Sequence, residues 1–260
     1  MRLLPFVVLL AVAAPANAEL KEFCASRPGL GTPACTIDAG HVMVEVGLTD
    51  WTLDNAPDDR TDSLIFGDFT VRVGLDDMTE AQVGWTPYGH VRIRDKATGV
   101  VMRTGGIGDV TLALRRSVSG PSGLIAVQPY VTLPTGGDAI GAGDWAAGLI
   151  VPIGFDLGHD VQLSLTPQIE ATVDQSRSGR HLSYGSVIGM SAPLTRGLTG
   201  AVEFQAIRDD DPSGKTTQTF ASTSLAWMVG ENTQFDLGCV AGLTSDSPDV
   251  EVYFGIARRF

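Results

Sequence analysis

Apolar and polar residues alternate without interruption along residues 161–174, which read VQLSLTPQIEATVD. Successive side chains of a β-strand point to opposite faces, so this alternation predicts a strand with one apolar and one polar face. Strands in globular proteins usually have about 3–10 residues, and this segment is longer. Its length and its unbroken apolar face are unusual for a strand of a soluble globular protein.

The same alternation recurs along the whole chain. No segment shows a convincing apolar stripe at helical spacing, so the predicted fold class is all-β. Pro129, Pro152 and Pro167 fall inside predicted strands and indicate bulges or strand ends, because proline cannot donate a ladder hydrogen bond. With 161–174 the predicted strands number twelve, the others being 41–51, 64–75, 79–89, 109–116, 124–134, 144–154, 181–193, 198–208, 217–229, 233–243 and 250–260.

The connections between these strands alternate strictly in length. The short ones are 75–77, 119–122, 157–160, 195–197 and 230–232, and the long ones are 54–62, 95–106, 135–143, 175–180, 209–215 and 245–249. Outer-membrane barrels have short periplasmic turns and longer outer loops, and a closed barrel leaves no backbone group unpaired in lipid. We therefore expect residues 40–260 to form a transmembrane antiparallel up-and-down β-barrel of about 12 strands.

A soluble β-sandwich or lipocalin-like barrel is the alternative, because alternation looks the same when the two faces are exchanged. Twelve strands would supply more apolar face than one soluble interior needs. Charged residues make up 18% of the chain, against about 25% in ordinary soluble domains. Both observations favour the membrane barrel.

The first residues have the pattern of a cleavable signal peptide over 1–18. Arg2 is followed by an apolar run and by Ala16-Asn17-Ala18, so the protein is expected to be exported to the outer membrane. Residues 19–39 are then a periplasmic segment ahead of the barrel. Cys24 and Cys35 flank a Gly/Pro-rich stretch and are a plausible disulfide pair in an oxidising compartment, with no further ligands nearby for a metal.

The polar faces supply the candidate site, a lumen with more acids than bases. The net charge of −12 argues against a nucleic-acid partner, and no motif indicates a cofactor, a metal or a calcium loop. The candidate lumen residues are Glu45, Asp68, Arg72, Glu80, Gln82, Arg115, Gln128, Gln162, Gln168, Glu170, Glu203, Gln205, Asp236 and Glu251. Barrels of about eight strands are filled by side chains and barrels of about 16–18 strands hold a wide aqueous pore. A barrel of twelve strands is intermediate, so the pattern leaves open whether this lumen conducts.

One residue pair raises the question of an enzyme. His181 and Ser183 share a strand face, as a nucleophile and its base must. The pair resembles that of outer-membrane phospholipases and lipid A deacylases, but Arg180 and Tyr184 replace the Asn residues of those families, and the pair is predicted to face the lumen. No catalytic residue is assigned, and we expect a protein that is not an enzyme.

Two sets of motifs resemble known outer-membrane proteins. The end VEVYFGIARRF, with Phe254, Ile256 and Phe260 on one face, is similar to the signal that the barrel insertion machinery recognises, although Arg258 departs from it. GGIGDVTLALRRSV (105–118), AVQPYVTLPTGG (126–137) and VGLDDMTEAQVGW (73–85) resemble the outer-membrane family named for the meta-pathway of phenol degradation. That resemblance implies a barrel that passes small organic compounds, often proposed to be aromatic.

The expected function is therefore passive uptake of small hydrophobic or neutral solutes through an outer-membrane channel. The expected partners are outer-membrane lipid, lipopolysaccharide, the insertion machinery and the solutes themselves. A non-conducting structural barrel is the first alternative and an outer-membrane lipid hydrolase the second.

Overall fold

A computed structural model describes residues 20–120 and 123–260, so the predicted signal peptide lies outside the described residues. No helix in the described part of the chain is long and apolar enough to cross a membrane. The strands are β1 Val42–Asp54, β2 Asp59–Phe66, β3 Asp68–Asp76, β4 Thr79–Trp85, β5 Tyr88–Asp95, β6 Val101–Gly106, β7 Val110–Ser117, β8 Ala126–Leu133, β9 Ala146–Ile150, β10 Ile153–Asp156, β11 Gln162–Val173, β12 Arg180–Thr195, β13 Leu198–Asp209, β14 Thr216–Met228, β15 Thr233–Gly242 and β16 Val250–Arg259.

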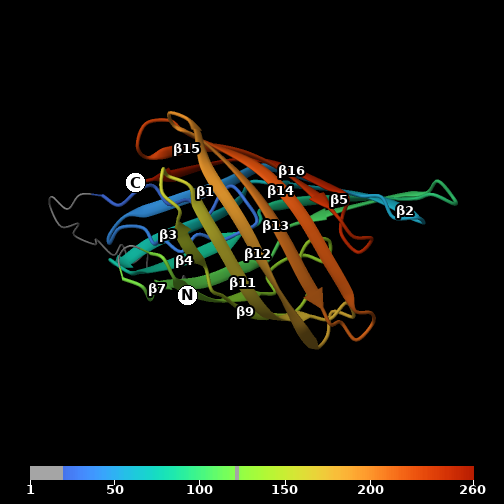
Figure 1. The fold of residues 1–260 in the computed structure, drawn as a ribbon. Coiled ribbons are helices and arrows are strands. Elements are labelled where there is room, and N and C mark those ends of the chain that lie inside the picture. The colour runs from blue at the N-terminus through green and yellow to red at the C-terminus, as the bar shows by residue number, and fades with distance from the viewer. Residues whose placement is uncertain (1–19, 121–122) are drawn as a thin grey trace, which may run out of the picture.

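The sixteen strands form one closed antiparallel barrel with twelve wall strands (Figure 1). Four of the twelve wall strands are interrupted, so that each consists of two successive strands: β2 and β3, β4 and β5, β6 and β7, and β9 and β10. The breaks contain residues that suit a kink, such as Gly67 at φ 70° and Pro152. β16 pairs with β1 and closes the barrel, which confirms the predicted architecture.

The three strand prolines behave differently from one another. Pro152 lies between β9 and β10, as expected of a strand end. Pro129 lies where the β7–β8 pairing is interrupted between Tyr130 and Val127. Pro167 stays inside the β11–β12 ladder, so no strand end occurs there.

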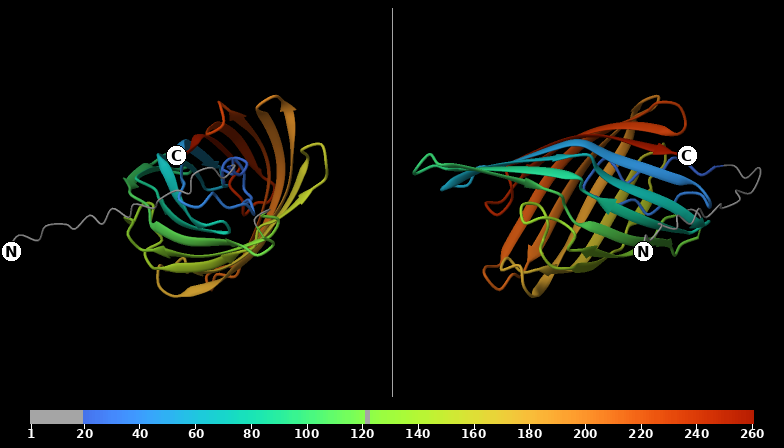
Figure 2. Two further views of the ribbon diagram at one scale, coloured as in Figure 1. Left: turned by 90° about the vertical axis from the view of Figure 1, so that its left-hand side faces the viewer. Right: turned by 180° about the vertical axis from the view of Figure 1, so that it is seen from behind.

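Two predicted loops are partly strands. Residues 59–62 and 101–106, expected within the long connections, belong to β2 and β6 and continue the pairing. The last part of β1 pairs with β2, which pairs with β5, and β5 with β6. This four-stranded sheet extends beyond the barrel at the end opposite the C-terminus (Figure 2).

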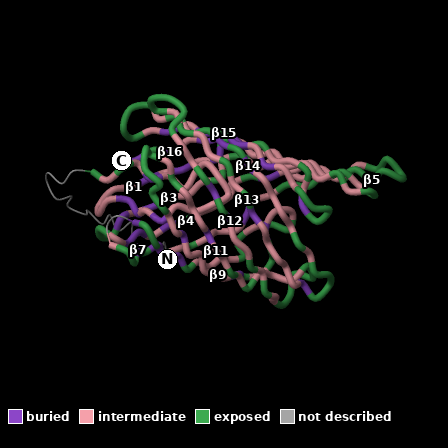
Figure 3. The backbone as a smooth tube through the Cα atoms, viewed as in Figure 1, coloured by how far each residue is buried: buried purple, intermediate pink, exposed green. Residues whose placement is uncertain are grey.

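The two faces of the wall have the chemistry of a membrane barrel. The largest fully buried side chains include Arg72, Arg115 and Glu80, whereas Ile188 and Phe204 are exposed on the outer face. A lipocalin-like protein would have the reverse, an apolar interior and a polar outside. Most of the wall has intermediate exposure, and buried stretches lie near β1, β3 and β7, toward the end that holds the C-terminus (Figure 3).

A charge placed on the outer face should destabilise the barrel. Leu165 lies on the outer face of β11, where it pairs with Ile153 and Ile188. We expect Leu165→Arg to cost roughly 2–4 kcal/mol of folding free energy in lipid vesicles, because the guanidinium would face hydrocarbon near the midplane. Gln168→Arg, on the inner face of the same strand, is the matched control and should cost far less. Urea titrations of both variants measure the difference, and equal losses would mean that the faces are misassigned.

Candidate pore and its N-terminal plug

The lumen is not left to solvent, because the chain's own N-terminal segment enters it (Figure 2). We call residues 20–40 the plug. Residues 19–39 are expected from the sequence to lie in the periplasm, but the contacts place the described part inside the barrel. The physical reason is that this segment has no regular secondary structure, so its backbone N–H groups need other partners, which the wall carboxylates provide.

One side of the plug rests on a buried ion cluster from β1, β3 and β4. Arg72 Nη1 lies 2.8 Å from Glu45 Oε1, and Arg72 Nε lies 2.8 Å from Glu80 Oε1. Arg72 Nη1 also donates to the carbonyl of Cys24 at 2.6 Å. Glu45 accepts the backbone N–H of Ser26, and Glu80 that of Ile37. The wall charges therefore hold the plug as well as one another.

The disulfide between Cys24 and Cys35 closes the centre of the plug into a loop. Arg115, on β7, is 1% exposed and donates to the carbonyl of Cys35 at 3.1 Å and to Ser26 Oγ at 3.1 Å. Each end of the disulfide loop is thus bound by one buried arginine of the wall.

The other side of the plug contacts the opposite wall. Arg27 forms an ion pair with Asp236 of β15 at 3.0 Å, and Tyr253 of β16 accepts the N–H of Gly29 at 2.9 Å. Glu203 of β13 accepts the N–H groups of Leu30 at 2.7 Å and Gly31 at 2.9 Å. Since the plug reaches strands on both sides, it crosses the lumen.

Two wall glycines let the plug lie this close. A Cβ at Gly74 would overlap the carbonyl oxygen of Asp38, and one at Gly255 would overlap the guanidinium of Arg27. Larger residues at either position would push the plug away from the wall.

A cavity of about 330 Å³ lies beside the wall of β3, β4, β7 and β8. Its lining mixes small, polar and apolar groups. The lining residues are Asp68, Phe69, Thr70, Gln82, Gly84, Trp85, Thr86, Asp109, Thr111, Ala113, Gln128, Tyr130 and Ile150. Gln82 and Gln128 also belong to the hydrogen-bonded network around Glu80 and Arg115, so the cavity adjoins the wall that holds the plug.

Residues 25–260 match the protein family described as "Putative MetA-pathway of phenol degradation". The chain belongs to this family. No curated protein sequence matches this chain. Among solved structures, the COG4313 outer membrane channel from Pseudomonas putida F1 is similar at 16% identity and a TM-score of 0.71, covering 90% of this chain and 99% of that one. The β domain of the Bordetella autotransporter BrkA is similar at 11% identity and a TM-score of 0.55, and the match covers 86% of this chain and 100% of that one. These likenesses show the fold, an outer-membrane β-barrel.

Two of the three family motifs of the sequence, 105–118 and 126–137, meet in space. Asp109, of the GGIGD stretch, accepts the N–H groups of Gly136 at 2.7 Å and Ala142 at 2.7 Å, in the loop after LPT. The N–H of Val110 donates to Thr135 Oγ1 at 2.9 Å. Gly136 is required there, because a Cβ would overlap the backbone of Gly108. The hydrogen bonds between the two motifs therefore fix the loop 134–145 next to the cavity.

The predicted lumen residues fall into groups. Glu45, Arg72, Glu80, Arg115, Glu203 and Asp236 contact the plug, and Asp68, Gln82 and Gln128 line the cavity. Tyr130 hydrogen-bonds Glu170, Glu251 lies beside Asp50, Gln205 is buried, Gln168 is half-buried and Gln162 is exposed at the end of its strand.

The structure gives no support to the His181–Ser183 pair as catalytic machinery. His181 Nδ1 lies 2.9 Å from Asp174 and its Nε2 2.8 Å from Asp209, so both ring nitrogens face carboxylates. Phe254 and Phe260 of the predicted insertion signal are exposed on the outer wall, and Ile256 pairs with Val46 and Phe235.

Proposed function

We propose that this protein is a passive outer-membrane channel for small neutral organic solutes, including single-ring aromatic compounds, and that it catalyses no reaction. The lumen cavity is the observation that carries the proposal. Its volume of about 330 Å³ is at the lower end of ligand pockets, and about 150 Å³ is already enough for benzene. The family description, which refers to phenol degradation, supports it, and so does the similar Pseudomonas structure, which is described as an outer membrane channel.

The chemistry of the lumen favours neutral solutes over anions. Asp68 and Glu170 contribute acidic groups and no basic group to the inner face, and a narrow low-dielectric passage disfavours an anion beside them. Tyr130, Ile150 and Thr111 provide weak contacts for a neutral ring. The plug restricts the passage to small molecules.

The surroundings of the channel belong to the same proposal. The exposed apolar wall contacts outer-membrane lipid, with lipopolysaccharide around the outer loops. The C-terminal strand, with exposed Phe254 and Phe260, is the segment that the insertion machinery would bind.

Liposome swelling with the purified barrel tests the function. We expect faster swelling in a small neutral sugar such as arabinose than in a large organic anion such as gluconate. Ala113→Phe, which fills the cavity, should slow entry of the sugar. Leu114→Phe is the matched control, because Leu114 is 43% exposed on the outer face. No difference from empty liposomes across neutral solutes, with no conductance in planar bilayers, would reject the channel and leave the structural barrel.

A further inference from the structure

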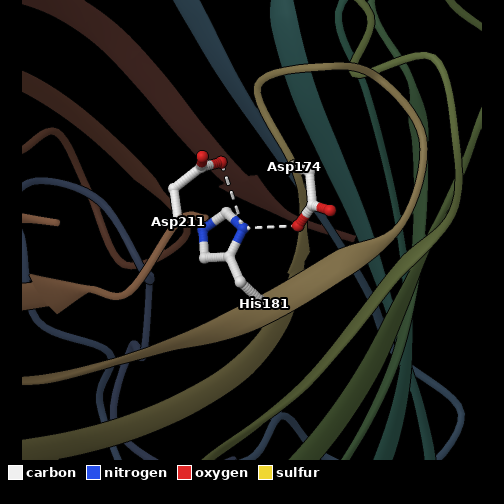
Figure 4. A group of neighbouring side chains, drawn as sticks. All are labelled: Asp174, His181 and Asp211. Carbon is white, nitrogen blue, oxygen red and sulfur yellow. Dashed lines mark hydrogen bonds and ion pairs between the residues drawn. The ribbon is translucent and has the colours of Figure 1, made fainter. Parts of the chain in front are cut away.

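Asp174, His181 and Asp211 lie side by side in the loop region that follows β11 and β13 (Figure 4). Asp174 follows β11, His181 is the second residue of β12, and Asp211 lies in the loop after β13. His181 Nδ1 is 2.9 Å from Asp174 Oδ1 and 3.3 Å from Asp211 Oδ2, and one ligand atom from each residue lies within 4.8 Å of the others. Three segments therefore present three metal-binding atoms to one point.

The groups of this cluster are held in place. The side chain of His181 is 6% exposed. Asp211 accepts the backbone N–H groups of Gln175 and Ser213, both at 2.7 Å. These bonds, with one from the Ser213 hydroxyl, lower the pKa of Asp211 to about 2, so its carboxylate is ionised at neutral pH. The backbone of Asp174 is fixed by the turn that Arg177 and Gly179 close.

The charges of the cluster do not balance. Asp174, Asp209 and Asp211 all face His181, so even a protonated imidazole would leave two negative charges. The neighbouring cations are engaged elsewhere, since Arg208 and Lys215 both pair with Asp210. Only one proton fits on Nδ1, although two carboxylates face it. The contact between Nε2 and Asp209 lacks hydrogen-bond geometry, which leaves this buried nitrogen without a hydrogen-bond partner among the described residues.

We propose that Asp174, His181 and Asp211 bind a divalent first-row transition metal such as Zn²⁺. One imidazole nitrogen and two carboxylates are a ligand set of such metals, with water in the fourth position. Ligands about 2.0–2.1 Å from a tetrahedral metal lie about 3.3 Å apart, close to the two Nδ1–carboxylate distances. With a metal on Nδ1 the imidazole is neutral, so the two positive charges offset two of the three carboxylate charges that face it. Asp209, 2.8 Å from Nε2, is the outer carboxylate that would accept the Nε2 proton once Nδ1 binds the metal.

The site would join the loop 174–180 to the loop 210–215 at the outer mouth. This role goes beyond solute passage, because it concerns the structure of the loops and not the cavity. It also differs from the expectation, based on sequence motifs, of no metal. Asp174 and His181 flank one hairpin loop, whereas Asp211 comes from the loop after β13, and the pairing of β12 with β13 brings it to the other two.

Metal binding to the detergent-solubilised full barrel tests the proposal. The protein is treated with chelator, desalted and titrated with Zn²⁺ in a calorimeter, with bound metal counted by mass spectrometry. We expect one tightly bound Zn²⁺ per chain. His181→Ala and Asp174→Asn should abolish the tight site, and Asp209→Asn should weaken it by about 10–100-fold. His159→Ala is the matched control, since His159 is exposed in the turn after β10 and should leave binding unchanged.

A heat-modifiability gel checks that every variant still forms a barrel. A Co²⁺ titration of wild-type protein gives a second readout that needs no variant, because tetrahedral Co²⁺ with nitrogen and oxygen ligands has visible absorption bands. The proposal is overturned if wild-type protein retains no metal, or if folded His181→Ala binds Zn²⁺ as wild type does. In the first case the cluster is a metal-free ion network around His181.

Discussion

Deleting residues 22–36 is expected to raise the single-channel conductance severalfold and to admit solutes that the wild-type barrel excludes. The deleted residues include Arg27, which pairs with Asp236, and Leu30 and Gly31, whose N–H groups bind Glu203. These contacts carry the plug across the lumen, and no strand of the barrel depends on them for its ladder. The measurement is conductance in planar bilayers, together with swelling rates for a series of sugars of increasing size.

Two controls distinguish the loss of the plug from an unspecific effect of deleting residues. Removing residues 96–99, at the tip between β5 and β6, should leave the conductance unchanged because this tip lies outside the lumen. Reducing the Cys24–Cys35 disulfide of the intact protein, or replacing both cysteines by serine, should give a smaller increase and more frequent current fluctuations, since the plug keeps its other contacts. An unchanged conductance after the deletion would show that these residues do not limit the passage.

The strand pattern predicted the wall well because each position on a membrane barrel faces either lipid or lumen, with little in between. Local irregularities escaped it. Alternation from Val44 onward places Asp50 on the outer face, but a bulge at Leu48 shifts the register, so that Thr49 is opposite Phe254 and Asp50 is opposite Tyr253. Asp50 therefore joins the lumen beside Glu251. A single inserted residue reverses the faces beyond it, and no period in the sequence marks it.

The plug could not be predicted from periodicity at all. Residues 20–40 have no alternation, and their position depends on single hydrogen bonds to carboxylates more than a hundred residues away, such as Leu30 to Glu203. The acidic residues of the wall were identified as lumen residues, but their partners were not. An excess of carboxylates over arginines on the inner face was the available signal, because buried carboxylates need donors.

Replacing Arg72 by methionine is expected to destabilise the barrel by about 3–5 kcal/mol, the usual cost of removing one partner from a buried ion pair. Arg72 is 0% exposed and neutralises Glu45 and Glu80, which are 2% and 0% exposed. Without it, Arg115, 3.5 Å from Glu80, is left with both acids, and the carbonyl of Cys24 loses its donor. Urea-induced unfolding in lipid vesicles, followed by tryptophan fluorescence, measures the loss.

The cause of this loss can be tested by removing the charges together. The triple variant Arg72→Met, Glu45→Gln, Glu80→Gln should recover most of the stability, because no unpaired acid remains and each glutamine oxygen still accepts the plug's N–H groups. Arg116→Met is the matched surface control; its pair with Asp76 is about half exposed on both sides, so the change should be under about 1 kcal/mol. If Arg72→Met were no worse than Arg116→Met, the cluster would contribute no more than a surface ion pair. If the triple variant were as unstable as Arg72→Met alone, lost packing and not unpaired charge would account for the effect.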